Sequence, residues 1–108
     1  MKDNQALIVV DVQKDFLETG ALPVKDVSQV VPVINRISPK FKHVVFTQDW
    51  HPQGHISFAS SHSGEAPYST IDIPYGKQVL WPEHCVQNTT GAEFADGLNT
   101  ENGDCFVK

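Results

Sequence analysis

Clustered basic residues, paired cysteine motifs and long apolar runs are all missing from this 108-residue sequence. The eight Lys and Arg residues are scattered and outnumbered by thirteen Asp and Glu residues, and the formal net charge of -5 argues against nucleic acid or membrane-surface partners. The apolar run near the N-terminus extends only from Ala6 to Val10, which is too short for a signal peptide core or a membrane span. We therefore expect a cytoplasmic protein.

Cysteine is scarce, with only Cys85 and Cys105 present. Their spacing does not resemble a disulfide framework, so we expect two reduced thiols. The hydrophobic content of 40% is spread along the chain and interrupted by seven Gly and seven Pro residues, which is typical of a globular protein. The length suits a single folded unit.

Three short apolar runs predict β-strands, and they cover Ala6–Val10, residues 43–46 and Cys105–Val107. Continuous rather than alternating apolarity is typical of parallel strands that are covered on both faces, as in α/β proteins. Between the first two runs, apolar residues recur at helical spacing. They are Val27, Val30, Val31, Ile34 and Ile37. Because a proline is tolerated only in the first helical turn, Pro32 predicts a helix start near residues 29–31, and Pro39 predicts its end.

Residues 52–80 are rich in Ser, Gly, Pro and His and show neither helical nor strand periodicity. We expect a long ordered loop there, and loops of this length within a domain are commonly functional. Residues 92–98 predict a short helix, with Gly97 near its end.

Two histidines and one aspartate form a candidate metal site. Asp49 and His51 are two residues apart, so both side chains leave an extended segment on the same face. His84, two residues after Pro82, is the expected third ligand. Two imidazoles and a carboxylate leave positions open for water or substrate, whereas a structural zinc site is usually closed by thiolates. His55 remains open as a fourth ligand, a hydrogen-bond donor to a ligand or a loop anchor.

Charged side chains follow each predicted strand. Asp11 comes directly after the first, Asp49 and His51 follow the second, and Lys108 follows the third. In open parallel sheets, ligands bind beyond the carboxyl ends of the strands, so we expect these groups to converge on one crevice.

Three long motifs carry a family resemblance. They are D-V-Q-K-D-F-L-E-T-G-A-L at 11–22, Q-D-W-H-P-Q-G-H-I-S-F-A at 48–59 and L-W-P-E-H-C-V-Q-N-T-T-G-A-E-F at 80–94. In order and spacing they resemble the nicotinamidase/pyrazinamidase family of the isochorismatase-like cysteine hydrolases. Thr19 and Asn88 stand where members often have Gly. The resemblance implies a Rossmann-like three-layer α/β fold with a parallel sheet, of which residues 1–108 supply about half as the N-terminal portion of one domain.

The resemblance also implies roles for individual residues. Asp11 would be the general base and Lys108 the cation of an Asp-Lys-Cys triad, and Phe16 and Trp81 would be aromatic walls of the substrate pocket. Asp49, His51 and His84 would hold one divalent ion, zinc or iron, that binds the pyridine nitrogen of nicotinamide. The implied reaction, a step in NAD salvage, passes through a cysteine thioester to the acid and ammonia.

The nucleophilic cysteine of the family is not found in this chain. Cys85 directly follows a metal ligand and Cys105 lies inside the third apolar run, so neither is placed to attack. We expect the C-terminal portion of the enzyme to exist as a separate or additional segment, with the end after Lys108 fitting proteolytic cleavage, and the 108 residues not to persist as a free monomer. A homo-oligomer is a further expectation. The alternatives are a non-catalytic metal-binding fragment, another isochorismatase-like hydrolase and a non-haem iron oxygenase.

Overall fold

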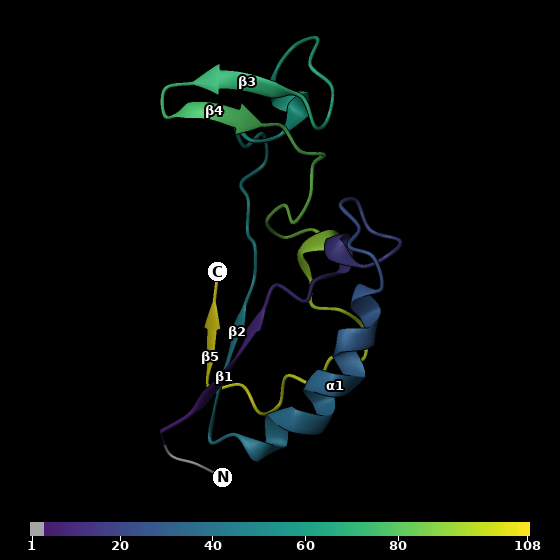
Figure 1. The fold of residues 1–108 in the computed structure, drawn as a ribbon, viewed down its shortest axis with the longest axis vertical. Helices are drawn as coiled ribbons and strands as arrows, with labels where there is room; N and C mark the ends of the chain where they lie inside the picture. Colours follow the sequence, from purple (N-terminus) through teal and green to yellow (C-terminus); the bar gives the residue numbers. More distant parts are fainter. Residues whose placement is uncertain (1–3) are drawn as a thin grey trace.

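The computed structural model describes residues 4–108, which form a small parallel sheet, one α-helix and a separate hairpin (Figure 1). The sheet contains β1 (Ala6–Val10), β2 (His43–Thr47) and β5 (Cys105–Val107), and α1 spans Val30–Ile37. The hairpin consists of β3 (Thr70–Ile73) and β4 (Gly76–Val79). Short 3-10 turns lie at Lys14–Phe16, Val27–Gln29, Ser38–Lys40, Ala59–Ser61 and Thr90–Ala92.

The three predicted strands are confirmed and pair in the order β1-β2-β5, with both pairs parallel. β2 extends one residue beyond its predicted end, to Thr47, which lies opposite Val10. Because all three strands point the same way, the residues that follow them lie at one edge of the sheet. The predicted α/β class with a parallel sheet is therefore confirmed.

The helix α1 begins at Val30, within the predicted range. Pro32 is its third residue, where the missing backbone N–H has no partner inside the helix. The helix ends at Ile37, and Pro39 lies in the 3-10 turn that follows. No helix among residues 4–108 is long and apolar enough to cross a membrane.

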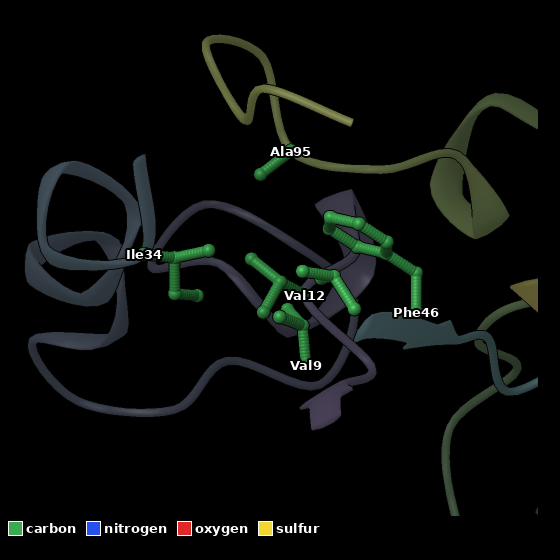
Figure 2. Packing of buried hydrophobic residues seen from close by; sticks show 6 residues of the cluster. Val9, Val12, Ile34, Phe46 and Ala95 are labelled. Carbon is green, nitrogen blue, oxygen red and sulfur yellow. The ribbon is translucent and has the colours of Figure 1, made fainter. Parts of the chain in front are cut away.

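The hydrophobic core lies between one face of the sheet, α1 and the segment around Ala95 (Figure 2). Its buried members are Val9, Val12, Ile34, Val44, Phe46 and Ala95. The expectation that the strands are covered on both faces is wrong for the described residues. Ile8 and Val10 of β1, an edge strand of the described sheet, remain 60% and 63% exposed.

Two further predictions are corrected. Residues 92–98 form no α-helix, because Ala95 N–H donates to Val12 C=O and Phe94 bridges Gln13 in an antiparallel manner. Only the 3-10 turn Thr90–Ala92 precedes this pairing. The predicted loop at 52–80 contains the β3–β4 hairpin. Its first strand, T-I-D-I at 70–73, alternates polar and apolar residues, a pattern that the prediction overlooked.

Candidate metal centre

The three predicted ligands come from two segments that lie side by side. Asp49 and His51 follow β2, and His84 belongs to an irregular segment more than thirty residues later. Backbone hydrogen bonds join the segments, since His51 N–H donates to Cys85 C=O at 2.8 Å and Gln87 N–H donates to His51 C=O at 2.8 Å. This parallel bridge sets His84 beside His51, with ring centroids 4.8 Å apart.

The donor atoms of Asp49, His51 and His84 all lie within 4.8 Å of one another. His51 Nε2 is 3.5 Å from Asp49 Oδ1, and His84 Nε2 is 3.4 Å from Asp49 Oδ2. In a tetrahedral site with bonds of about 2.0 to 2.1 Å, neighbouring ligand atoms are separated by roughly 3.4 Å. The two distances, each to a different oxygen of Asp49, are close to this spacing.

Hydrogen bonds to backbone carbonyls fix the tautomers of both imidazoles. His51 Nδ1 lies 3.2 Å from His84 C=O, and His84 Nδ1 lies 2.7 Å from Pro82 C=O. A carbonyl only accepts, so each Nδ1 carries a proton, and in a neutral ring each Nε2 then presents a lone pair. Two lone pairs facing a carboxylate would repel it, so the arrangement requires a cation between them, either protons or a metal ion. These residues therefore fit a divalent metal.

The surroundings of the cluster favour a neutral imidazole at His51. His84 is buried and its neighbours His51 and Asp49 are half-buried. Phe58 contacts both imidazole rings edge-on, at centroid distances of 5.1 and 5.6 Å. Burial lowers the pKa of His51 below its usual value, with the Asp49 carboxylate opposing this effect and His84 adding to it. A depressed pKa keeps the ring in the form that binds metal.

His55 lies outside the group of three ligands, although its ring centroid is 4.9 Å from that of His51. Its Nδ1 accepts a hydrogen bond from Ser57 N–H at 3.1 Å and lies 2.8 Å from Ser57 Oγ. Its carbonyl accepts from the hydroxyl of Ser61 at 2.8 Å. Of the three roles that the sequence left open, these contacts are those of a loop anchor.

Asp11 and Lys108 lie at the same sheet edge but on opposite sides of β2. Asp11 follows β1 and Lys108 follows β5, so roughly 10 Å of sheet separates them. Asp11 adopts a left-handed conformation, with φ of 55°, and its Oδ1 accepts a hydrogen bond from Thr47 Oγ at 2.6 Å. Lys108 Nζ lies 4.3 Å from the centre of the Trp50 ring. The two groups share an edge without touching.

Thr47 is a site residue that the sequence pattern did not single out. Besides its bond to the Asp11 carboxylate, its Oγ accepts a hydrogen bond from Asp11 N–H at 3.1 Å. A hydroxyl at the last position of β2, opposite the residue before Asp11, is the only signal that could have indicated it.

The two predicted aromatic walls have different neighbours. Phe16 packs against a candidate ligand, with its ring centroid 5.6 Å from that of His84. Trp81 contacts Tyr68 edge-on at 6.0 Å, and its backbone bridges Phe58. Phe16 therefore borders the ligand cluster directly, whereas the indole of Trp81 packs toward the loop before β3.

Cys85 is buried in the turn that follows His84. Burial raises the pKa of its thiol to about 12, and the carboxylates of Asp49, Asp15 and Asp11 add to the shift. A thiol with this pKa is protonated at neutral pH and is a poor nucleophile. This agrees with the interpretation that Cys85 is not the attacking residue. Cys105 is unpaired and exposed on β5, so both thiols are free, as predicted.

Comparisons with known proteins give a consistent result. Residues 5–108 match the model of the isochorismatase domain. The chain is 49% identical over 106 residues to a nicotinamidase of Acinetobacter baylyi, covering 98% of this chain and 50% of that protein. Among solved structures, it resembles the nicotinamidase/pyrazinamidase of Acinetobacter baumanii, with a TM-score of 0.92 and 48% identity over 98% of this chain and 51% of that one.

A second solved structure is the pyrazinamidase of Pyrococcus horikoshii in complex with zinc. It superimposes with a TM-score of 0.69 and 42% identity, covering 95% of this chain and 50% of that one. The chain thus spans about half the length of the relatives it matches.

Proposed function

This chain belongs to the isochorismatase family, and on that premise we propose that it is the N-terminal part of a metal-dependent nicotinamidase. The proposed enzyme hydrolyses nicotinamide, and also pyrazinamide, to the carboxylic acid and ammonia. The observation that supports this most strongly is the cluster of Asp49, His51 and His84, with both Nε2 atoms turned toward one carboxylate. The zinc complex of a pyrazinamidase with 42% identity favours the same conclusion.

Asp49, His51 and His84 would hold zinc or iron, which would bind the pyridine nitrogen and so orient the carboxamide. Asp11 acts as the general base that accepts the proton of a cysteine thiol lying outside residues 1–108 and returns it to the leaving ammonia. It later takes a proton from the hydrolytic water and returns it to the departing thiolate. The Thr47 hydroxyl holds Oδ1 of this carboxylate, which leaves Oδ2 for proton transfer. Lys108 supplies positive charge that stabilises the thiolate. Phe16, which packs against His84, would flank the substrate ring, and Trp81 remains a predicted second wall.

The rest of the domain, in this proposal, packs against the open side of β1 and α1. A groove of about 490 Å³ runs there, and its lining includes Ile8 and Val10 of β1 and Val30 and Val33 of α1. The radius of gyration, 16.1 Å, exceeds the roughly 13 Å expected for a complete domain of this length. Both observations favour a chain that completes its fold with a further segment. A cytoplasmic location and a homo-oligomer remain predictions.

Ammonia release from nicotinamide by the complete protein, supplied with zinc or iron, tests the proposal. We expect equimolar nicotinate and ammonia, and Asp11→Asn should lower kcat by about 100-fold to 10,000-fold because it removes the base. Asp96→Asn is the matched control, since the Asp96 side chain is 94% exposed, and should leave kcat unchanged. No turnover, or full turnover by Asp11→Asn, would refute the proposal. Metal and nicotinamide binding without turnover would favour a non-catalytic role.

A further inference from the structure

The segment that follows β1, residues 13–15, contacts both segments that supply the metal ligands. Gln13 is fully buried, and its side-chain amide forms three hydrogen bonds. Nε2 donates to Asp49 C=O at 2.9 Å and to Ala92 C=O at 2.8 Å. Oε1 accepts from Asp49 N–H at 2.8 Å. The amide thus holds both backbone polar groups of Asp49, as a neighbouring strand would.

This double contact constrains the direction in which the Asp49 side chain leaves the backbone. Both N–H donors of the Gln13 amide are used, and one of them also ties Asp49 to the segment at Ala92. Buried hydrogen bonds of this kind are costly to leave unmade, so the Gln13 amide and the Asp49 backbone fix each other. The Asp49 carboxylate is thereby kept between the two imidazoles.

Asp15 makes the corresponding contact to the other ligand segment. Its Oδ2 accepts a hydrogen bond at 2.8 Å from the backbone N–H of Cys85, the residue after His84. Cys85 has φ of 48°, a left-handed conformation that a side chain bearing Cβ adopts only at a cost. A charge-assisted hydrogen bond from the Cys85 N–H to the Asp15 carboxylate offsets that cost and holds the turn. Phe16, the next residue, packs against the His84 ring.

We infer that Gln13 and Asp15 are positioning residues for the metal centre, with Gln13 orienting Asp49 and Asp15 orienting His84. The inference rests on the proposed function, because it requires these ligands to bind a divalent ion. Neither residue contacts the ion or the substrate in this assignment. Groups that orient metal ligands typically change metal affinity by about 10-fold to 100-fold when removed.

Zinc affinity of the complete protein, measured by competition with a chromophoric chelator, tests the inference for Gln13. Gln13→Met should bind Zn²⁺ about 10-fold to 100-fold more weakly than wild type. Gln48→Met is the matched control, because the Gln48 amide donates to the same Ala92 carbonyl at 3.0 Å without a side-chain bond to Asp49. It should stay within about threefold of wild type. Visible absorption of Co²⁺ bound in place of Zn²⁺ should change in Gln13→Met alone, since these bands report ligand geometry.

A folded Gln13→Met protein that binds Zn²⁺ as tightly as Gln48→Met would overturn the inference for Gln13. Should Gln13→Met fail to fold, the half-buried Asp15 offers a second pair of variants. Asp15→Asn keeps an acceptor for Cys85 N–H and should retain Zn²⁺ affinity within about threefold, whereas Asp15→Ala should lose about 10-fold. Equal affinities of these two variants would overturn the inference. Absence of Zn²⁺ binding by wild type would instead refute the proposed metal site itself.

Discussion

Gly91 leaves room for the Asp15 carboxylate, and filling that room should disturb the turn that carries His84. A Cβ on residue 91 would overlap the carboxylate carbon and both oxygens of Asp15. Gly91→Ala therefore forces Asp15 to move. Overpacking of this kind costs about 1 to 3 kcal/mol. If Asp15 turns away, the Cys85 N–H loses a hydrogen bond to a charged acceptor, which is worth about 1.5 to 3 kcal/mol.

Together these effects should lower the free energy of unfolding of Gly91→Ala by about 2.5 to 6 kcal/mol in urea titrations of the complete protein. Thr90→Ala, at an exposed neighbouring position, should change it by about 0.5 kcal/mol or less. Asp15→Ala alone should cost about 1.5 to 3 kcal/mol. The double variant should be no less stable than Asp15→Ala, because the overlap is gone. The coupling energy should therefore equal the whole Gly91→Ala loss, about 2.5 to 6 kcal/mol. Additive effects of the two substitutions would refute the reasoning.

Other tests concern the ligands, the thiol and the core. Because burial lowers the pKa of His51 in the folded state, the unfolded state takes up the proton first. The free energy of unfolding of the metal-free protein should therefore decrease as pH falls below about 6.5. A higher free energy of unfolding at pH 5.5 than at pH 7.5, measured by urea titration, would contradict this. Cys85 should escape iodoacetamide at pH 7.5 in the native protein and react in urea, and peptide mapping that finds it alkylated in both states would oppose the buried thiol. Phe46→Ala should lower the free energy of unfolding by about 3 to 5 kcal/mol, whereas Phe106→Ala should lower it less because Phe106 is partly exposed. Equal losses of stability in thermal unfolding would contradict the central place of Phe46 in the core.

Much of the sheet was predictable because its signals are local. Continuous apolar runs located β1, β2 and β5, and Pro32 fixed the start of α1 near Val30. The hairpin was missed because the alternation of polar and apolar residues in β3 is short and lies within a Ser-rich and Gly-rich segment. The helix predicted at 92–98 failed because pairing with residues 12 and 13, far away in sequence, overrode the local preference.

Part of the candidate metal site was likewise predictable from the sequence, and part was not. The spacing of Asp49 and His51 predicts that they share a face, and His84, two residues after Pro82, is the expected third ligand. The family resemblance implies the same three residues. No periodic signal marks Gln13 or Thr47, whose side-chain hydrogen bonds join residues 36 positions apart. Long-range polar contacts of this kind depend on the tertiary arrangement and become visible only in the structure.

Zinc K-edge X-ray absorption of the complete protein, loaded with one equivalent of Zn²⁺, tests whether Asp49, His51 and His84 bind one metal ion. We expect only nitrogen and oxygen neighbours at about 2.0 to 2.2 Å, with the scattering pattern of two imidazoles. His84→Ala should remove one imidazole and weaken binding. A sulfur neighbour at about 2.3 Å, or a spectrum unchanged in His84→Ala, would contradict the assignment of these three ligands.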